Sequence, residues 1–186
     1  MRWNFDPLLI AAFATLAVAV GLGRSAAPRA GWVAVTLLFV IFVSPLCALS
    51  SALFSVRVFH HLLLVAAVAP LLAVALPMKR AGSPSLSALV VVHAVILWLW
   101  HAPGAYAWGL ATVPAYWLMQ SSLLGSAWLM WRAILAPAVQ PGPTLVGLVA
   151  TVGQMGLLGA LIVFASRPLY TAHFASTCAL GAHPAR

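Results

Sequence analysis

The stretch FSVRVFHHLLLVAAVAPLLAVALP, residues 54–77, decides the fold that this sequence predicts. It is long enough to cross a bilayer, because a hydrocarbon core of roughly 30 Å needs about 20 apolar residues in a helix. Its first turns nevertheless carry Arg57, His60 and His61, and Pro70 lies further along. Ionisable groups at membrane depth are costly and usually face a bundle interior or a cavity. This segment is therefore predicted to be a membrane span that carries part of a functional site.

The composition of the whole chain points to the same class of protein. Of the 186 residues, 65% are hydrophobic and 5% are charged, and the mean hydropathy is +1.10. Soluble domains contain about 25% charged residues, so we expect an all-α, polytopic integral membrane protein. Asp6 is the only carboxylate side chain. This excludes chemistry that needs paired carboxylates and oxygen-rich sites for Ca²⁺ or Mg²⁺.

Six apolar segments are separated by breaks that are basic or rich in Gly, Pro and Ser. We therefore predict one transmembrane helical domain, residues 1–186, with a C-terminal tail at 166–186. The first segment has a basic head and a small-residue SAA site at 25–27, as signal peptides do, but Asp6 and the long apolar run argue against cleavage. The predicted spans lie near residues 7–23, 32–54, 58–77, 86–101, 116–135 and 144–165.

The net charge of +8 does not indicate nucleic-acid binding, because the basic residues form no stripe and have no aromatic platform. Positive residues beside membrane spans instead act as topology signals. Slightly more of them fall on the side of the first, third and fifth loops, which the positive-inside rule places in the cytoplasm. Both termini are then expected on the periplasmic side of a bacterial inner membrane. The loop-side residues are Arg24, Arg29, Lys79, Arg80 and Arg132; the others are Arg2, Arg57, Arg167 and Arg186.

Alternating helix direction is expected to bring most of the metal-binding side chains to one face of the membrane. Imidazole, thiolate and thioether groups suit copper rather than Mg²⁺ or Ca²⁺. Adjacent residues on a helix point about 100° apart, so His60 and His61 are not expected to share one centre. His61 and His101, from neighbouring antiparallel helices, form the predicted pair for Cu⁺. The weaker candidate ligands are His60, Met119 and Cys47.

Simpler interpretations of the same residues stay open. An interfacial histidine is often only a hydrogen-bonding group, methionine is often packing, and tryptophans near His101 suit the aromatic belt of a membrane interface. His93 is the exception to the common face, about 12 Å deeper than His101 in the same helix. In the last span, Gly153, Gly156 and Gly159 place small residues where helices can approach closely.

Three motifs in order resemble the CtaG-type membrane proteins, which are assembly factors for haem–copper cytochrome c oxidase of the caa type. They are FSVRVFHHLLLVAAVAPLL at 54–72, LWLWHAPGAYAWGL at 97–110 and LLGALIVFASRPLY at 157–170. The similarity extends from about residue 32 to 183. It implies a non-enzymatic inner-membrane protein that interacts with oxidase subunits and helps to place copper, at the binuclear haem–copper centre.

The chain departs from the family pattern at several positions. Arg57 stands where the family usually has a histidine four residues before the one matched by His61, and Tyr116 and Gln120 stand where another histidine is common. The further span that usually follows the tail is not part of this sequence. These differences favour a second hypothesis, a structural subunit that packs on the oxidase without metal. A small transporter with Arg57 and His93 along its path is a third, although the spans contain no carboxylate.

Overall fold

The computed structural model describes residues 3–76, 85–136, 141–167 and 169–170, and these residues contain helices and no strand. This confirms the all-α class. The chain divides into two compact units, Met1–Arg80 and Ala81–Arg186. Each unit is described by itself. Units of this kind occur within one domain as well as in separate domains, so the single domain stays a prediction.

The first unit is built from helices that begin at prolines or polar caps. Asp6 caps the first helix, because its carboxylate accepts hydrogen bonds from the amides of Leu8 (2.8 Å) and Leu9 (3.3 Å). Proline opens several helices, where its missing N–H is no loss. The elements are α1 (Pro7–Ala19), the π-helix η1 (Val20–Arg24), α2 (Pro28–Phe42), α3 (Pro45–Ala52), α4 (Phe54–Leu62), the π-helix η2 (Leu63–Val68) and α5 (Ala69–Ala75).

One continuous helix, Phe54–Ala75, runs through α4, η2 and α5. Pro70 lies inside it, where a regular α-helix would lose a hydrogen bond and meet a steric clash. The wider π turn avoids a break, since the N–H of Ala69 donates to the carbonyl of Leu64, five residues earlier. The helix predicted from the opening stretch is therefore present, and it starts at Phe54.

The predicted single span over residues 32–54 is wrong. The helix α2 ends at Phe42, and Ser44 then caps α3, which begins at Pro45. Leu53 is extended and separates α3 from α4. Pro45 therefore starts a new helix instead of lying inside one, because a proline is tolerated at the first position of a helix and not in its interior.

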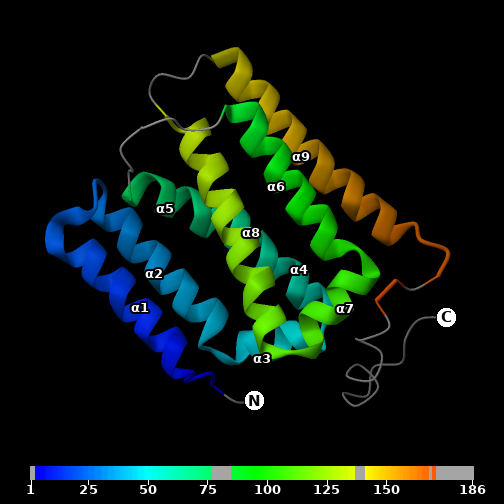
Figure 1. Cartoon of the computed structure of the whole chain (residues 1–186), viewed down its shortest axis with the longest axis horizontal. Coiled ribbons are helices and arrows are strands. Elements are labelled where there is room, and N and C mark those ends of the chain that lie inside the picture. Colours follow the sequence, from blue (N-terminus) through cyan, green and yellow to red (C-terminus); the bar gives the residue numbers. More distant parts are fainter. Residues whose placement is uncertain (1–2, 77–84, 137–140, 168, 171–186) are drawn as a thin grey trace. The chain divides into compact units, whose positions relative to one another are not determined.

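Close helix contact in the first unit depends on Gly31 of α2. Figure 1 shows α1 and α2 running side by side, joined through η1. A Cβ atom added at Gly31 would lie 2.9 Å from both Cγ atoms of Val20 and 3.4 Å from the Cβ of Ala75. Val20 and Ala75 are themselves fully buried. The absence of a side chain at Gly31 therefore lets α2 pack against η1 and α5 together.

In the second unit, α6 and α8 pack along each other, and α9 lies along α6 (Figure 1). Leu89, Met130 and Ile134 form a buried apolar cluster between α6 and α8. The indole N–H of Trp98 donates to the Gln154 side-chain oxygen (3.0 Å) and joins α6 to α9. The elements are α6 (Leu86–His101), α7 (Pro103–Ala111), α8 (Val113–Ile134) and α9 (Pro141–Val163).

Two helices in the described ranges are long and apolar enough to cross a membrane, Phe54–Ala75 and Pro141–Val163. A third candidate is the pair Leu86–His101 and Pro103–Ala111, which is bent by 75°. Pro7–Leu22 and Pro28–Phe42 are shorter apolar helices. These helices indicate a membrane protein, whereas the six spans expected from the sequence stay a prediction.

Replacing Gly31 by alanine tests the contact between α2 and η1. Overpacking costs about 1–3 kcal/mol, which exceeds the roughly 1 kcal/mol that alanine gains over glycine in a helix. We expect a lower thermal unfolding midpoint in detergent. Gly153→Ala in α9 is the matched control, because nothing lies within 4 Å of its added Cβ, and it should leave the midpoint unchanged or higher. Equal midpoints for the two variants would contradict this packing.

Candidate functional site

The five candidate copper ligands lie in two groups. Cys47, His60 and His61 belong to the first unit, and His101 and Met119 belong to the second. The structure brings His60 and His61 together, as described below. The pairing of His61 with His101 joins different units and stays a prediction. His173, Cys178 and His183 of the predicted tail lie outside the described residues.

The polar turn of α4 is buried. Relative exposure is 1% for Arg57, 0% for His60 and 7% for His61. His60 and His61 follow Arg57 by three and four residues, so each lies next to Arg57 on the helix surface. Burial keeps these groups away from lipid. In membrane proteins, functional polar side chains usually face the bundle interior.

His60 and His61 are neighbours in space as well as in sequence. Their ring centroids are 5.9 Å apart, with planes inclined at 73°. The rings of Phe42 and His60 also pack against each other nearly at a right angle, with 5.1 Å between their centroids. Neither ring nitrogen of His60 has a hydrogen-bond partner among the described residues. Buried polar groups in this state are rare in proteins, and some of them have a binding or catalytic role.

Cys47 lies in α3, half-buried. The hydroxyl of Ser50, which is fully buried, donates a hydrogen bond to the Cys47 carbonyl (2.8 Å). The helix α3 packs on α4. Cys47 is thus held in the element that lies next to the polar turn.

His101 ends α6 at a sharp corner. Its Nδ1 is 2.7 Å from the carbonyl oxygen of Leu97. A carbonyl only accepts, so Nδ1 donates, and the lone pair of the neutral ring belongs to Nε2. A metal-binding histidine usually has this arrangement, with the second nitrogen bonded to a carbonyl or carboxylate.

Tyr170, which follows α9, contacts the same corner. Its hydroxyl donates to the carbonyl of His101 (2.8 Å), and its ring packs on Tyr106 of α7, with 4.4 Å between centroids. Burial raises the pKa of Tyr170, so the hydroxyl stays protonated and able to donate. The chain after α9 is therefore tied to the bend between α6 and α7.

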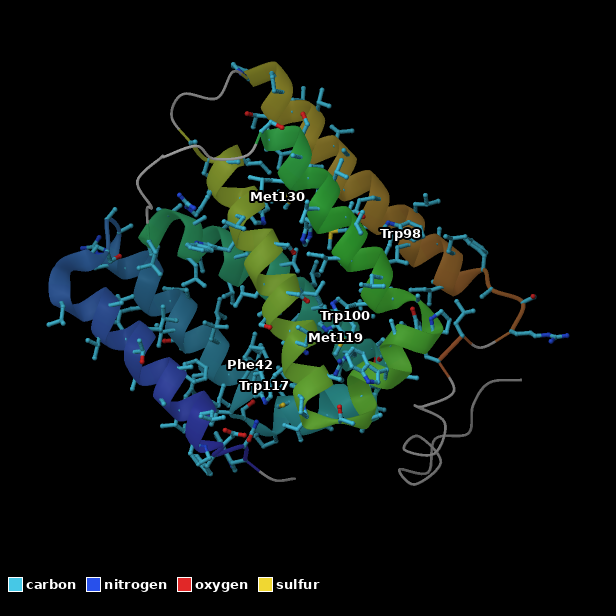
Figure 2. All side chains as sticks on the ribbon, in the orientation of Figure 1. Phe42, Trp98, Trp100, Trp117, Met119 and Met130 are labelled. Carbon is cyan, nitrogen blue, oxygen red and sulfur yellow. The ribbon has the colours of Figure 1, made fainter. Side chains whose placement is uncertain are left out.

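Met119 of α8 is fully buried and packs near Gly109 of α7. Its sulfur would be 3.2 Å from a Cβ at Gly109 of α7, and a ring carbon of Trp100 would be 3.3 Å from the same point. Trp100 in turn donates to Ser122 (2.8 Å) and stacks on Trp108. Figure 2 labels Trp100 and Met119. The Met119 thioether and the Trp100 ring therefore both lie close to Gly109, and Trp100 is the residue before His101.

Sequence reasoning missed the partners of the deeper histidine, His93. Its Nδ1 lies 3.0 Å from the hydroxyl oxygen of Ser126, and that hydroxyl lies 3.2 Å from the carbonyl of Leu123. If the hydroxyl donates to the carbonyl, Nδ1 must donate to the hydroxyl, which gives His93 one fixed tautomer.

A helical repeat in the sequence could have identified this inner face of α8. Its polar and sulfur-containing residues recur every three or four positions, which places them on one side of a helix. Thr151 of α9 meets the same face, since its hydroxyl lies 3.5 Å from the sulfur of Met130. The repeating positions are Met119, Ser122, Ser126 and Met130.

Gln120, next to Met119, is also buried (2% exposed). Neither its amide nitrogen nor its amide oxygen has a hydrogen-bond partner in the described part of the chain. No three side chains of His, Cys, Asp or Glu in these ranges are placed to hold one metal ion. A copper site built from the described residues alone would therefore use two such side chains or include methionine.

The comparison with protein families decides the classification. The family model for cytochrome c oxidase caa3 assembly factors matches residues 83–185, more than half of the chain. The chain belongs to this family. The match includes the corner at His101 and the exit at Tyr170, whereas α4 lies before it. No curated protein and no solved structure matches the chain.

Ser126→Ala tests the internal bond of this assembly factor. The variant leaves the buried Nδ1 of His93 without its acceptor, and an unsatisfied buried group costs about 1–3 kcal/mol. We expect a lower unfolding midpoint. Ser121→Ala is the matched control on the same helix, because the hydroxyl of Ser121 is exposed and donates to the Leu118 carbonyl within the helix. Indistinguishable midpoints would show that His93 does not depend on Ser126.

Proposed function

We propose that this family member is a multi-pass inner-membrane protein that hands Cu⁺ to the oxidase at its binuclear haem–copper centre. Membership in the caa3 assembly-factor family supports the oxidase as partner. Copper is the cargo in this proposal and not a resident cofactor. The protein binds and releases the ion without covalent chemistry, so it acts as an assembly factor and not as an enzyme.

The observation that carries the copper proposal is the bond from His101 Nδ1 to the Leu97 carbonyl. It directs the lone pair to Nε2 and holds the ring at the end of α6, as the outer partner of a metal ligand does. The thioether of Met119 lies close to Gly109 of α7 and is a soft donor that suits Cu⁺. His61 is the proposed ligand from the first unit, with His60 and Cys47 as further candidates.

A site with few ligands suits a carrier better than a closed cage. Structural metal sites surround the ion with four ligands and hold it permanently. Two or three soft donors bind Cu⁺ and leave a position open for the next acceptor. The ligand-poor character of the described residues agrees with transfer.

The copper proposal predicts a loss of binding in the double variant His61→Ala, His101→Ala. Affinity for Cu⁺, measured against a competing chelator, should fall by at least one to two orders of magnitude, about 1.4–2.8 kcal/mol. The matched control is His183→Ala in the predicted tail, which should bind as the wild type does. Unchanged affinity and stoichiometry in the double variant would remove these histidines from the proposed site.

The proposed membrane arrangement has six passes with both termini in the periplasm. The basic loop residues support it through the positive-inside rule. A C-terminal reporter that is active only in the cytoplasm should stay silent, and a periplasmic reporter at the same position should be active. The control fusion, after residue 80 in the third predicted loop, should give the opposite result. Strong cytoplasmic activity at the C-terminus would reverse the orientation.

A second candidate function is a structural subunit of the assembling oxidase. The observation that favours it is an open small-residue face on α9, where a Cβ at Gly153, Gly156 or Gly159 would meet nothing within 4 Å. Small residues allow another helix to approach closely. Arg57 and Gln120, which stand where the sequence resemblance leads us to expect histidines, agree with it. A wild-type protein that binds no Cu⁺ in vitro yet fully supports oxidase activity in cells would favour this candidate.

A further inference from the structure

We infer that His60 and His61 together form a two-coordinate Cu⁺ site within α4. The inference rests on the proposed copper function and assigns a different partner to His61, the adjacent histidine instead of His101. The helix α4 lies before residues 83–185, which the family model matches. The side chains that compose it are on one helix, and its existence does not depend on how the two units are arranged.

The ring separation suits a linear site. A bond from a metal to an imidazole nitrogen is about 2.0 Å, and the nitrogen lies about 1.1 Å from its ring centroid, so two rings on opposite sides of one ion have centroids about 6 Å apart. The observed separation is 5.9 Å. Despite the angle of about 100° between adjacent helix positions, the two rings therefore lie at the separation that a shared ion requires.

The surroundings leave the His60 ring available for an ion and closed to solvent. His60 is 0% exposed, and neither of its nitrogens has a hydrogen-bond partner among the described residues. An unsatisfied buried imidazole is costly, and a metal bond would remove that cost. The Phe42 ring packs against the His60 ring at an interplanar angle of 82°.

The same surroundings select Cu⁺ over other ions. Zn²⁺ is almost always held by four ligands, or by three and a water, and no group of three candidate side chains occurs in the described ranges. Cu⁺ is stable with two nitrogen donors. The charge of Arg57, buried one turn before His60, repels the ion and lowers the affinity. A weakened site agrees with release to a partner.

The test measures Cu⁺ affinity of the purified full-length protein against a competing chelator, for wild type and for His60→Ala, His61→Ala and His101→Ala. Loss of either dyad histidine should lower affinity at least tenfold, whereas His101→Ala should retain the wild-type value. Unfolding midpoints without copper identify a variant that fails to fold. X-ray absorption of the Cu⁺-loaded wild type, which needs no variant, should give two nitrogen ligands and no sulfur.

The outcomes separate this inference from the proposed function. If His61→Ala and His101→Ala lose affinity while His60→Ala does not, the dyad is wrong and copper handling stands. A spectrum with sulfur or with a third nitrogen ligand also overturns the dyad. If the wild type binds no Cu⁺, both proposals fail. Two nitrogen ligands together with the loss in His60→Ala and His61→Ala support the dyad.

Discussion

Polar side chains on apolar helices must find their partners inside the protein, and much of the second unit depends on this constraint. Lipid offers no hydrogen bonds, so an unsatisfied group on a spanning helix is costly. Trp100 bonds to Ser122 and His93 to Ser126, which ties α6 to α8, and Trp98 bonds to Gln154, which ties α6 to α9. These three bonds set the register in which the apolar residues then pack.

The same constraint shapes the corner at His101. The His101 ring is hydrogen-bonded to the Leu97 carbonyl within α6. The His101 carbonyl accepts a hydrogen bond from the Tyr170 hydroxyl, which lies after α9. Pro103 then starts α7 at a bend of 75°. The corner is thus held from both sides, while the ring nitrogen that can bind a soft metal is left as the acceptor. Rigid support of this kind is what metal transfer needs, because a ligand that moves freely pays entropy at each capture.

The polar turn of α4 meets the constraint only in part. It is buried, yet the ring nitrogens of His60 have no partner among the described residues. Natural proteins retain such groups mainly at functional sites. The family match covers residues 83–185 and includes the corner at His101, whereas the polar turn lies before it.

The sequence by itself determined the all-α class, the helix that crosses Pro70 and the bounds of α6, because these follow from apolar length, composition and helix caps. It also identified the family from local motifs. Only the tertiary structure divided residues 32–54 at Ser44 and gave His93, Trp98 and Trp100 their partners, since such bonds join residues far apart in the chain. The 5.9 Å between His60 and His61 also required coordinates. Ideal helix angles describe where Cβ atoms point, whereas side-chain torsions and the packing of Phe42 decide where the rings lie.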